Sequence, residues 1–244
     1  MRFPGTDKSD ADQGAEQGGQ PLSALEAARQ GGADAGPVAG AVTSLVESLL
    51  DLGIDGKGPF DSAQKVADVK RAEKPDAEEA IDAVVRGHLK LAAAGGFVTG
   101  LGGFITLPVA LPVNVLEFYL LATRMVASVA SLRGYDIKRP EIRSAVLLTL
   151  VGADADDLLK KAGVMSTGRL ANLAAQRLPG PALMVVNKAV GFRLLSTVGR
   201  KTLTRFGRGV PVIGGVIGAG LDGYLLNRIA DHARHEFPPK VSAH

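Results

Sequence analysis

The chain has no cysteine and no tryptophan, and aromatic residues make up only 5% of its 244 residues. The absence of cysteine excludes a disulfide framework and any thiolate metal site, and it fits a reducing compartment. The first residues lack the apolar core and the small-residue cleavage site of a secretory signal, so we expect a cytoplasmic protein. The sequence also lacks a Gly-x-Ser-x-Gly elbow and a Walker phosphate loop. Composition therefore indicates no particular enzyme class.

Acidic residues are missing from one long stretch, because residues 158–221 hold ten basic residues and no acidic one. Residues 1–79 hold 15 acidic and 8 basic residues, whereas residues 80–244 hold 10 and 20. A basic field of this kind attracts phosphate, in lipid headgroups or in nucleic acid. Within the stretch only Phe192 and Phe206 could stack on bases, so we favour anionic lipid as the partner over nucleic acid.

We predict anionic-lipid contacts for seven of these basic residues, with a plain solvated face as the alternative for each. They are Lys160, Lys161, Arg193, Arg200, Lys201, Arg205 and Arg208.

Apolar residues recur at helical spacing along most of the chain, and no segment alternates as a strand would. The pattern predicts an all-α protein, a multi-helix bundle. Residues 1–37 are rich in polar residues and glycine, and they hold too few apolar side chains to form a core, so we expect a disordered acidic and polar tail. After this tail we expect two amphipathic N-terminal helices over 38–75, a helical domain over 76–237 and a tail over 238–244.

Several helix boundaries carry local signals. Asp76 followed by Glu79 predicts an N-cap, and Pro140 predicts the start of another helix. Gly134 is expected to end the helix that follows Pro112. A longer helix is expected from Pro181.

Two glycines are expected to interrupt the helix that begins at Pro181, one at Gly191 and one at Gly199. An acidic cluster lies earlier, at Asp154, Asp156 and Asp157. It could bind a metal or act as an acid–base group, but acids ahead of Leu158 and two lysines are typical of a capped helix N-terminus, which we prefer.

Two glycine-rich apolar runs, Leu91–Leu116 and Gly209–Leu221, each lead into a similar short sequence that contains an acid, a tyrosine and two leucines. We call these sequences, residues 116–121 and 221–226, the two similar phrases. The similarity suggests an internal pseudo-repeat, and the glycines and prolines favour two apolar helical hairpins. The first run has 26 residues without charge, more than the roughly 20 that a membrane span needs. The hairpins could dip into a bilayer or lie buried in a soluble bundle. Candidate helix-packing glycines are Gly96, Gly100, Gly215 and Gly223.

The two similar phrases also define a candidate polar site. It has six residues, namely an acid and a tyrosine from each phrase and an arginine further along: Glu117, Tyr119 and Arg124, and Asp222, Tyr224 and Arg228. One interpretation pairs the acids and arginines in a buried site between the two halves. The other leaves each acid as a cap or salt bridge at the edge of the apolar layer, with the tyrosines in the core or at an interface.

The spacing of the histidines gives little indication of a metal site. His232 and His235 are three residues apart near a helix end, a spacing that zinc could use, but no further ligands of matching spacing accompany them. A solvated helix end is the preferred interpretation, and His88 is expected to be packed in a helix. We therefore expect no metal and no cofactor.

Six segments together resemble the EcsC family: the run at 91–112, Arg124-Met125, residues 133–136, residues 140–143, Leu150-Val151-Gly152, and the stretch from Gly214 to Asp222. The resemblance covers residues 76–237. It implies a helical bacterial protein, cytoplasmic or membrane-associated, that is accessory to a transporter or secretion process. It carries over no catalytic residues.

Three hypotheses follow. The first is a non-enzymatic protein at the cytoplasmic face of the plasma membrane, bound to anionic lipid and to a membrane-protein partner such as a transporter. The second is a hydrolase-like enzyme whose site lies where Glu117, Asp222, Arg124 and Arg228 converge. The third is a soluble homo-oligomeric scaffold whose glycines pack protomers together.

Overall fold

The computed structural model describes most of the chain from residue 37 to residue 240. The parts outside the description are residues 1–36, 59, 94–112, 166–167, 207–213 and 241–244, and also the side chains of 37, 113–114, 197–206 and 214–221. All regular structure in the described part is helical, so the predicted all-α multi-helix fold is confirmed. The expected disordered tail and most of the first glycine-rich run lie outside the described residues.

Four helical segments precede residue 94. They are α2 (Pro37–Ser48), the π-helical η1 (Leu49–Ile54), α3 (Ala63–Glu73) and α4 (Ala77–Ala93). The Asp76 carboxylate accepts a hydrogen bond from the Glu79 backbone N–H at 2.9 Å, so the predicted N-cap of α4 is confirmed. Ser62 caps α3 in the same way.

The helix α6 (Val113–Leu132) lies at the centre of the bundle. It packs against α3, α4, η1, α7 and α11, and every residue from Leu120 to Leu132 is buried. Gly134 follows with φ +85°, in the left-handed region that favours glycine, so the predicted end of this helix is confirmed.

The second half of the chain supplies the remaining helices. They are α7 (Pro140–Val151), the 3₁₀ turn η2 (Gly152–Asp154), α8 (Ala155–Lys161), the 3₁₀ turn η3 (Leu170–Asn172), α9 (Leu173–Gln176), α10 (Gly180–Phe206) and α11 (Gly214–Glu236). Pro140 occupies the first turn of α7, as predicted. The second glycine-rich run is helical from Gly214 onward. The two hairpins and the pseudo-repeat stay predictions.

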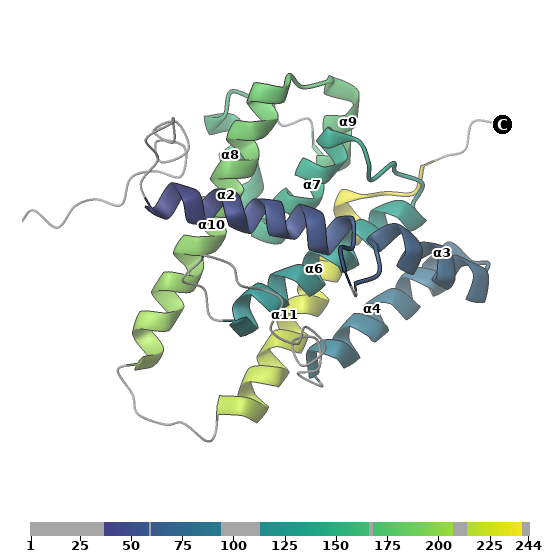
Figure 1. Cartoon of the computed structure of the whole chain (residues 1–244). Coiled ribbons are helices and arrows are strands. Elements are labelled where there is room, and N and C mark those ends of the chain that lie inside the picture. Colours follow the sequence, from purple (N-terminus) through teal and green to yellow (C-terminus); the bar gives the residue numbers. More distant parts are fainter. Residues whose placement is uncertain (1–36, 59, 94–112, 166–167, 207–213, 241–244) are drawn as a thin grey trace, which may run out of the picture.

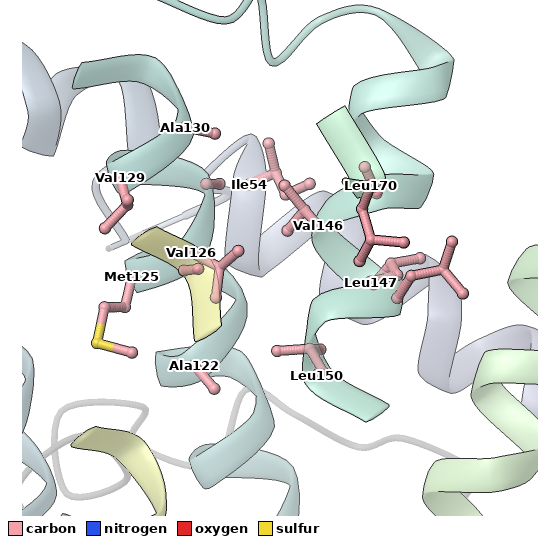
Figure 2. Close-up of a cluster of buried hydrophobic side chains, with 14 of the residues drawn as sticks. Ile54, Ala122, Met125, Val126, Val129, Ala130, Val146, Leu147, Leu150 and Leu170 are labelled. Atoms are coloured by element: carbon pink, nitrogen blue, oxygen red, sulfur yellow. The ribbon is translucent and has the colours of Figure 1, made fainter. Parts of the chain in front are cut away.

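One part of the core lies between α6 and α7. Figure 2 shows Ala122, Val126 and Ala130 of α6 beside Val146 and Leu147 of α7. All five side chains are fully buried. Because each fully buried apolar side chain of valine or leucine size contributes about 1.5–3 kcal/mol relative to exposure, this contact holds α6 in place.

The predicted interruption of the helix that contains Gly191 and Gly199 is wrong, because α10 continues through both. Gly191 instead lies where α10 crosses α2, a crossing visible in Figure 1. A Cβ at Gly191 would lie 2.8 Å from Val46 Cγ2 and 3.0 Å from Val42 Cγ1. The close approach of the two helices needs a glycine there, and the packing offsets the helix cost of about 1 kcal/mol.

Candidate functional site

The most buried polar contact among the described candidates joins α4 to α6. Arg124 of α6 is 7% exposed, and its Nε donates to Nε2 of His88, which is 3% exposed, at 3.2 Å. The other ring nitrogen of His88, Nδ1, lies 2.8 Å from the carbonyl oxygen of Val84. Because a carbonyl only accepts, Nδ1 carries the proton and Nε2 is left as the acceptor for Arg124. This contact requires a neutral imidazole.

Electrostatics favour the same protonation state. Burial, and then the charge of Arg124, lower the pKa of His88 from 6.5 to about 4, although its bond to the Val84 carbonyl acts in the opposite direction. Burial also lowers the pKa of Arg124, while the negative charge of Asp61 raises it. Arginine remains charged in proteins, so the pair holds one positive charge at neutral pH.

Two other candidates from the first phrase, Glu117 and Tyr119, lie nearer the start of α6. Both are half-buried, and Glu117 has a polar or electrostatic partner. Burial raises the pKa of Tyr119, whose ring meets Phe118 edge to face at 5.5 Å between centroids. The tyrosine is therefore packed at the edge of the core.

The matching residues of α11 lie in different surroundings. Asp222 is half-buried and also has a partner, whereas Tyr224 is 60% exposed and Arg228 is exposed. The two arginines of the similar phrases thus differ, because Arg124 is buried against His88. The convergence of the acids and arginines in one site stays a prediction.

The candidate packing glycines fall mostly outside the description. Gly96 and Gly100 lie in the segment 94–112, and of Gly215 only the helical backbone is described. At Gly223 no described atom lies within 4 Å of where a Cβ would be. Among the described glycines, Gly53 of η1 lies in a contact about as close as that of Gly191. A Cβ at Gly53 would lie 2.9 Å from the side chain of Thr123.

The basic residues differ in how far acids neutralise them. Arg193 binds the Asp154 carboxylate through Nη2 at 2.7 Å and through Nε at 2.8 Å, and Lys161 pairs with Asp157 at 2.7 Å. Lys160 is exposed. Arg200, Lys201 and Arg205 lie on the last turns of α10, where side chains are not described, and Arg208 lies outside the described residues.

The expected capping role of Asp154 is wrong for its side chain. Asp154 precedes α8, but it has helical φ and ψ of −79° and −10° and makes no side-chain cap hydrogen bond. Its carboxylate instead binds Arg193, which lies 39 residues further along the chain. Asp156 and Asp157 do lie in the first turn of α8, where the helix dipole favours acids.

A family model described as the EcsC protein family matches residues 37–238. The chain belongs to the EcsC protein family. Neither a curated protein nor a solved structure matches it. The match begins at residue 37, so it includes α2, η1 and α3, which lie before the segment that carries the resemblance in the sequence. Of these segments, η1 and α3 pack against α6, and α2 packs against α10 and η1. Buried residues of all three belong to one core with the rest of the EcsC chain.

One described helix of this EcsC protein is long and apolar enough to cross a membrane by length and composition. It is α6, in the window Val115–Leu132, and 78% of that window is buried inside the protein. Its apolar surface is used by the core, as expected for the central helix of a bundle.

The buried contact between His88 and Arg124 could be predicted only in part from the sequence. His88 follows Ile81, Val84 and Val85 at helical spacing, which places it on the apolar face of α4. Its expected packed position is confirmed. The partner, Arg124, lies 36 residues away, and no local pattern links the two.

Proposed function

We propose that this EcsC protein is a non-enzymatic protein that associates peripherally with the cytoplasmic face of a membrane and serves a transport or envelope process there. The observation that carries the proposal is the charge pattern, with ten basic residues and no acidic one over residues 158–221. Anionic lipid attracts such a segment. The transport role follows from the family resemblance alone.

The position of the basic residues supports this proposal. Asp154, just before α8, and Asp157, in its first turn, form ion pairs with Arg193 and Lys161. Arg200, Lys201 and Arg205 lie on the end of α10, which extends beyond α2 to the periphery of the described helices in Figure 1. This end of the helix is therefore the part of the basic stretch best placed to meet a membrane surface.

The burial of α6 supports a peripheral mode over a spanning one. A helix that crosses a bilayer turns apolar side chains toward lipid, whereas most of the α6 window is covered by neighbouring helices. Exposing it to lipid would separate α6 from α3, α4 and α7. We infer that membrane contact is made from the bundle surface.

Replacing Arg200, Lys201 and Arg205 with glutamine is expected to lower the partition coefficient onto vesicles of mixed neutral and anionic lipid. Each lost base removes on the order of 1 kcal/mol, so the expected reduction is about 100-fold at low ionic strength. Cosedimentation with vesicles over a range of lipid concentrations measures it.

A matched control removes the same charge from a different part of the fold. Lys57, Lys65 and Arg86 are exposed, and their replacement with glutamine also lowers the net charge by three. The control should change partitioning by no more than a few-fold. An equal loss in both variants, or no loss in the α10 variant, would contradict a contact through α10.

A further inference from the structure

The last turn of α11 brings three potential metal ligands together. His232, His235 and Glu236 are spaced i, i+3 and i+4, so they share one face of the helix. Their ligand atoms all lie within 4.8 Å of one another. His235 Nδ1 lies 3.0 Å from Glu236 Oε1, and His232 Nδ1 lies 3.8 Å from the same oxygen.

These separations match the edge of a metal coordination polyhedron. Zinc binds imidazole nitrogen and carboxylate oxygen at about 2.1 Å, so ligand atoms in a tetrahedral site lie about 3.4 Å apart. The two measured separations fall on either side of that value. The third separation, between the ligand atoms of the two histidines, is at most 4.8 Å.

We propose that His232, His235 and Glu236 bind a divalent transition metal ion of the zinc type at the C-terminal end of α11. Two imidazoles and one carboxylate, without a thiolate, are a ligand set that suits such ions. His235 is exposed, so an ion bound here would be accessible to water on the side of this residue.

The charge of Glu236 favours a cation at this position. Its side chain is 10% exposed, and in the described part of the chain no lysine or arginine forms an ion pair with it. Its described partners are the backbone N–H of Leu170 and the two histidines, so a divalent ion would add positive charge that no lysine or arginine supplies there.

The carboxylate of Glu236 is already held in place by the protein. Its Oε2 accepts a hydrogen bond at 2.7 Å from the backbone N–H of Leu170, at the start of η3. Groups that orient a ligand in this way strengthen metal binding. A bound ion would therefore also couple the end of α11 to η3.

The test uses the full chain without a histidine tag, freed of metal by a chelator. Zn²⁺ binding is measured by isothermal titration calorimetry, and Co²⁺ is added to follow its visible absorption, which reports tetrahedral coordination. We expect one site per chain. His235→Ala and Glu236→Gln should each weaken Zn²⁺ binding by at least about tenfold.

His244→Ala is the matched control, because it removes one histidine that lies away from the proposed ligands in the sequence. It should bind Zn²⁺ as the unaltered chain does. His235 is exposed, and the amide oxygen introduced by Glu236→Gln could still accept from the Leu170 N–H, so both variants should keep the helical circular dichroism spectrum. No binding by the unaltered chain, unchanged binding in His235→Ala, or lost binding in His244→Ala would each overturn the proposal.

Discussion

Gly191→Ala is expected to lower the free energy of unfolding by about 1–3 kcal/mol, the usual cost of adding a methyl group to a closely packed contact. The added Cβ would lie 2.8 Å from Val46 Cγ2, 3.0 Å from Val42 Cγ1 and 3.2 Å from the Val42 carbonyl oxygen. The carbonyl belongs to the backbone of α2, so the helices must separate. Denaturant unfolding followed by circular dichroism measures the change.

Gly223→Ala provides the comparison, since it makes the same chemical change within α11. No described atom lies within 4 Å of the added Cβ, so the higher helix propensity of alanine should raise stability by up to about 1 kcal/mol. Opposite signs for the two variants are expected. If Gly191→Ala is as stable as the unaltered chain, the close crossing of α2 and α10 is not present in solution.

Acidification is expected to destabilise the protein through His88. The pKa of His88 in the folded protein is about 4, below the unfolded value of 6.5. Above pH 6.5 the ring is neutral in both states, but between the two values the unfolded chain binds a proton that the folded chain excludes. The free energy of unfolding should therefore fall as pH drops from 6.5 to 4, by up to about 3 kcal/mol from this residue.

His88→Gln separates this effect from the other titrating groups. The glutamine amide oxygen can accept the hydrogen bond from Arg124 but does not titrate. Denaturant unfolding at several pH values should show a smaller acid-induced loss in this variant than in the unaltered chain, whatever its stability at pH 7. Equal losses in both proteins would show that His88 is accessible to protons in the folded state.

Much of the helical framework can be predicted from local sequence. Asp76 with Glu79, Pro140 and Gly134 each act on the turn in which they occur, so their effects need no knowledge of the fold. Gly191 shows the limit of this reasoning. Its helix cost is local, but the packing that outweighs it comes from α2, far away in the sequence.

The candidate site is less predictable, because its contacts join distant residues. The position of Asp154 before a helix predicts a cap, yet its carboxylate binds Arg193. The similarity of the two phrases predicts acids as partners of Arg124, which stays a prediction, but it gives no sign of the contact with His88 that the structure shows. Glu236 is adjacent to His235 in the sequence, but only the structure shows that its carboxylate lies within 4.8 Å of the ligand atoms of both His232 and His235.

The central claim is peripheral binding to anionic membranes, and cosedimentation of the unaltered chain with vesicles tests it most directly. Neutral and anionic vesicles are compared at low and high salt, and the pellets are then washed with carbonate. Peripheral binding predicts pelleting with anionic vesicles only, with release by salt, because screening weakens the attraction of the basic residues. Pelleting that resists both salt and carbonate would indicate inserted hairpins, and absence of pelleting would indicate a protein without membrane affinity. Either result would contradict peripheral binding through charge.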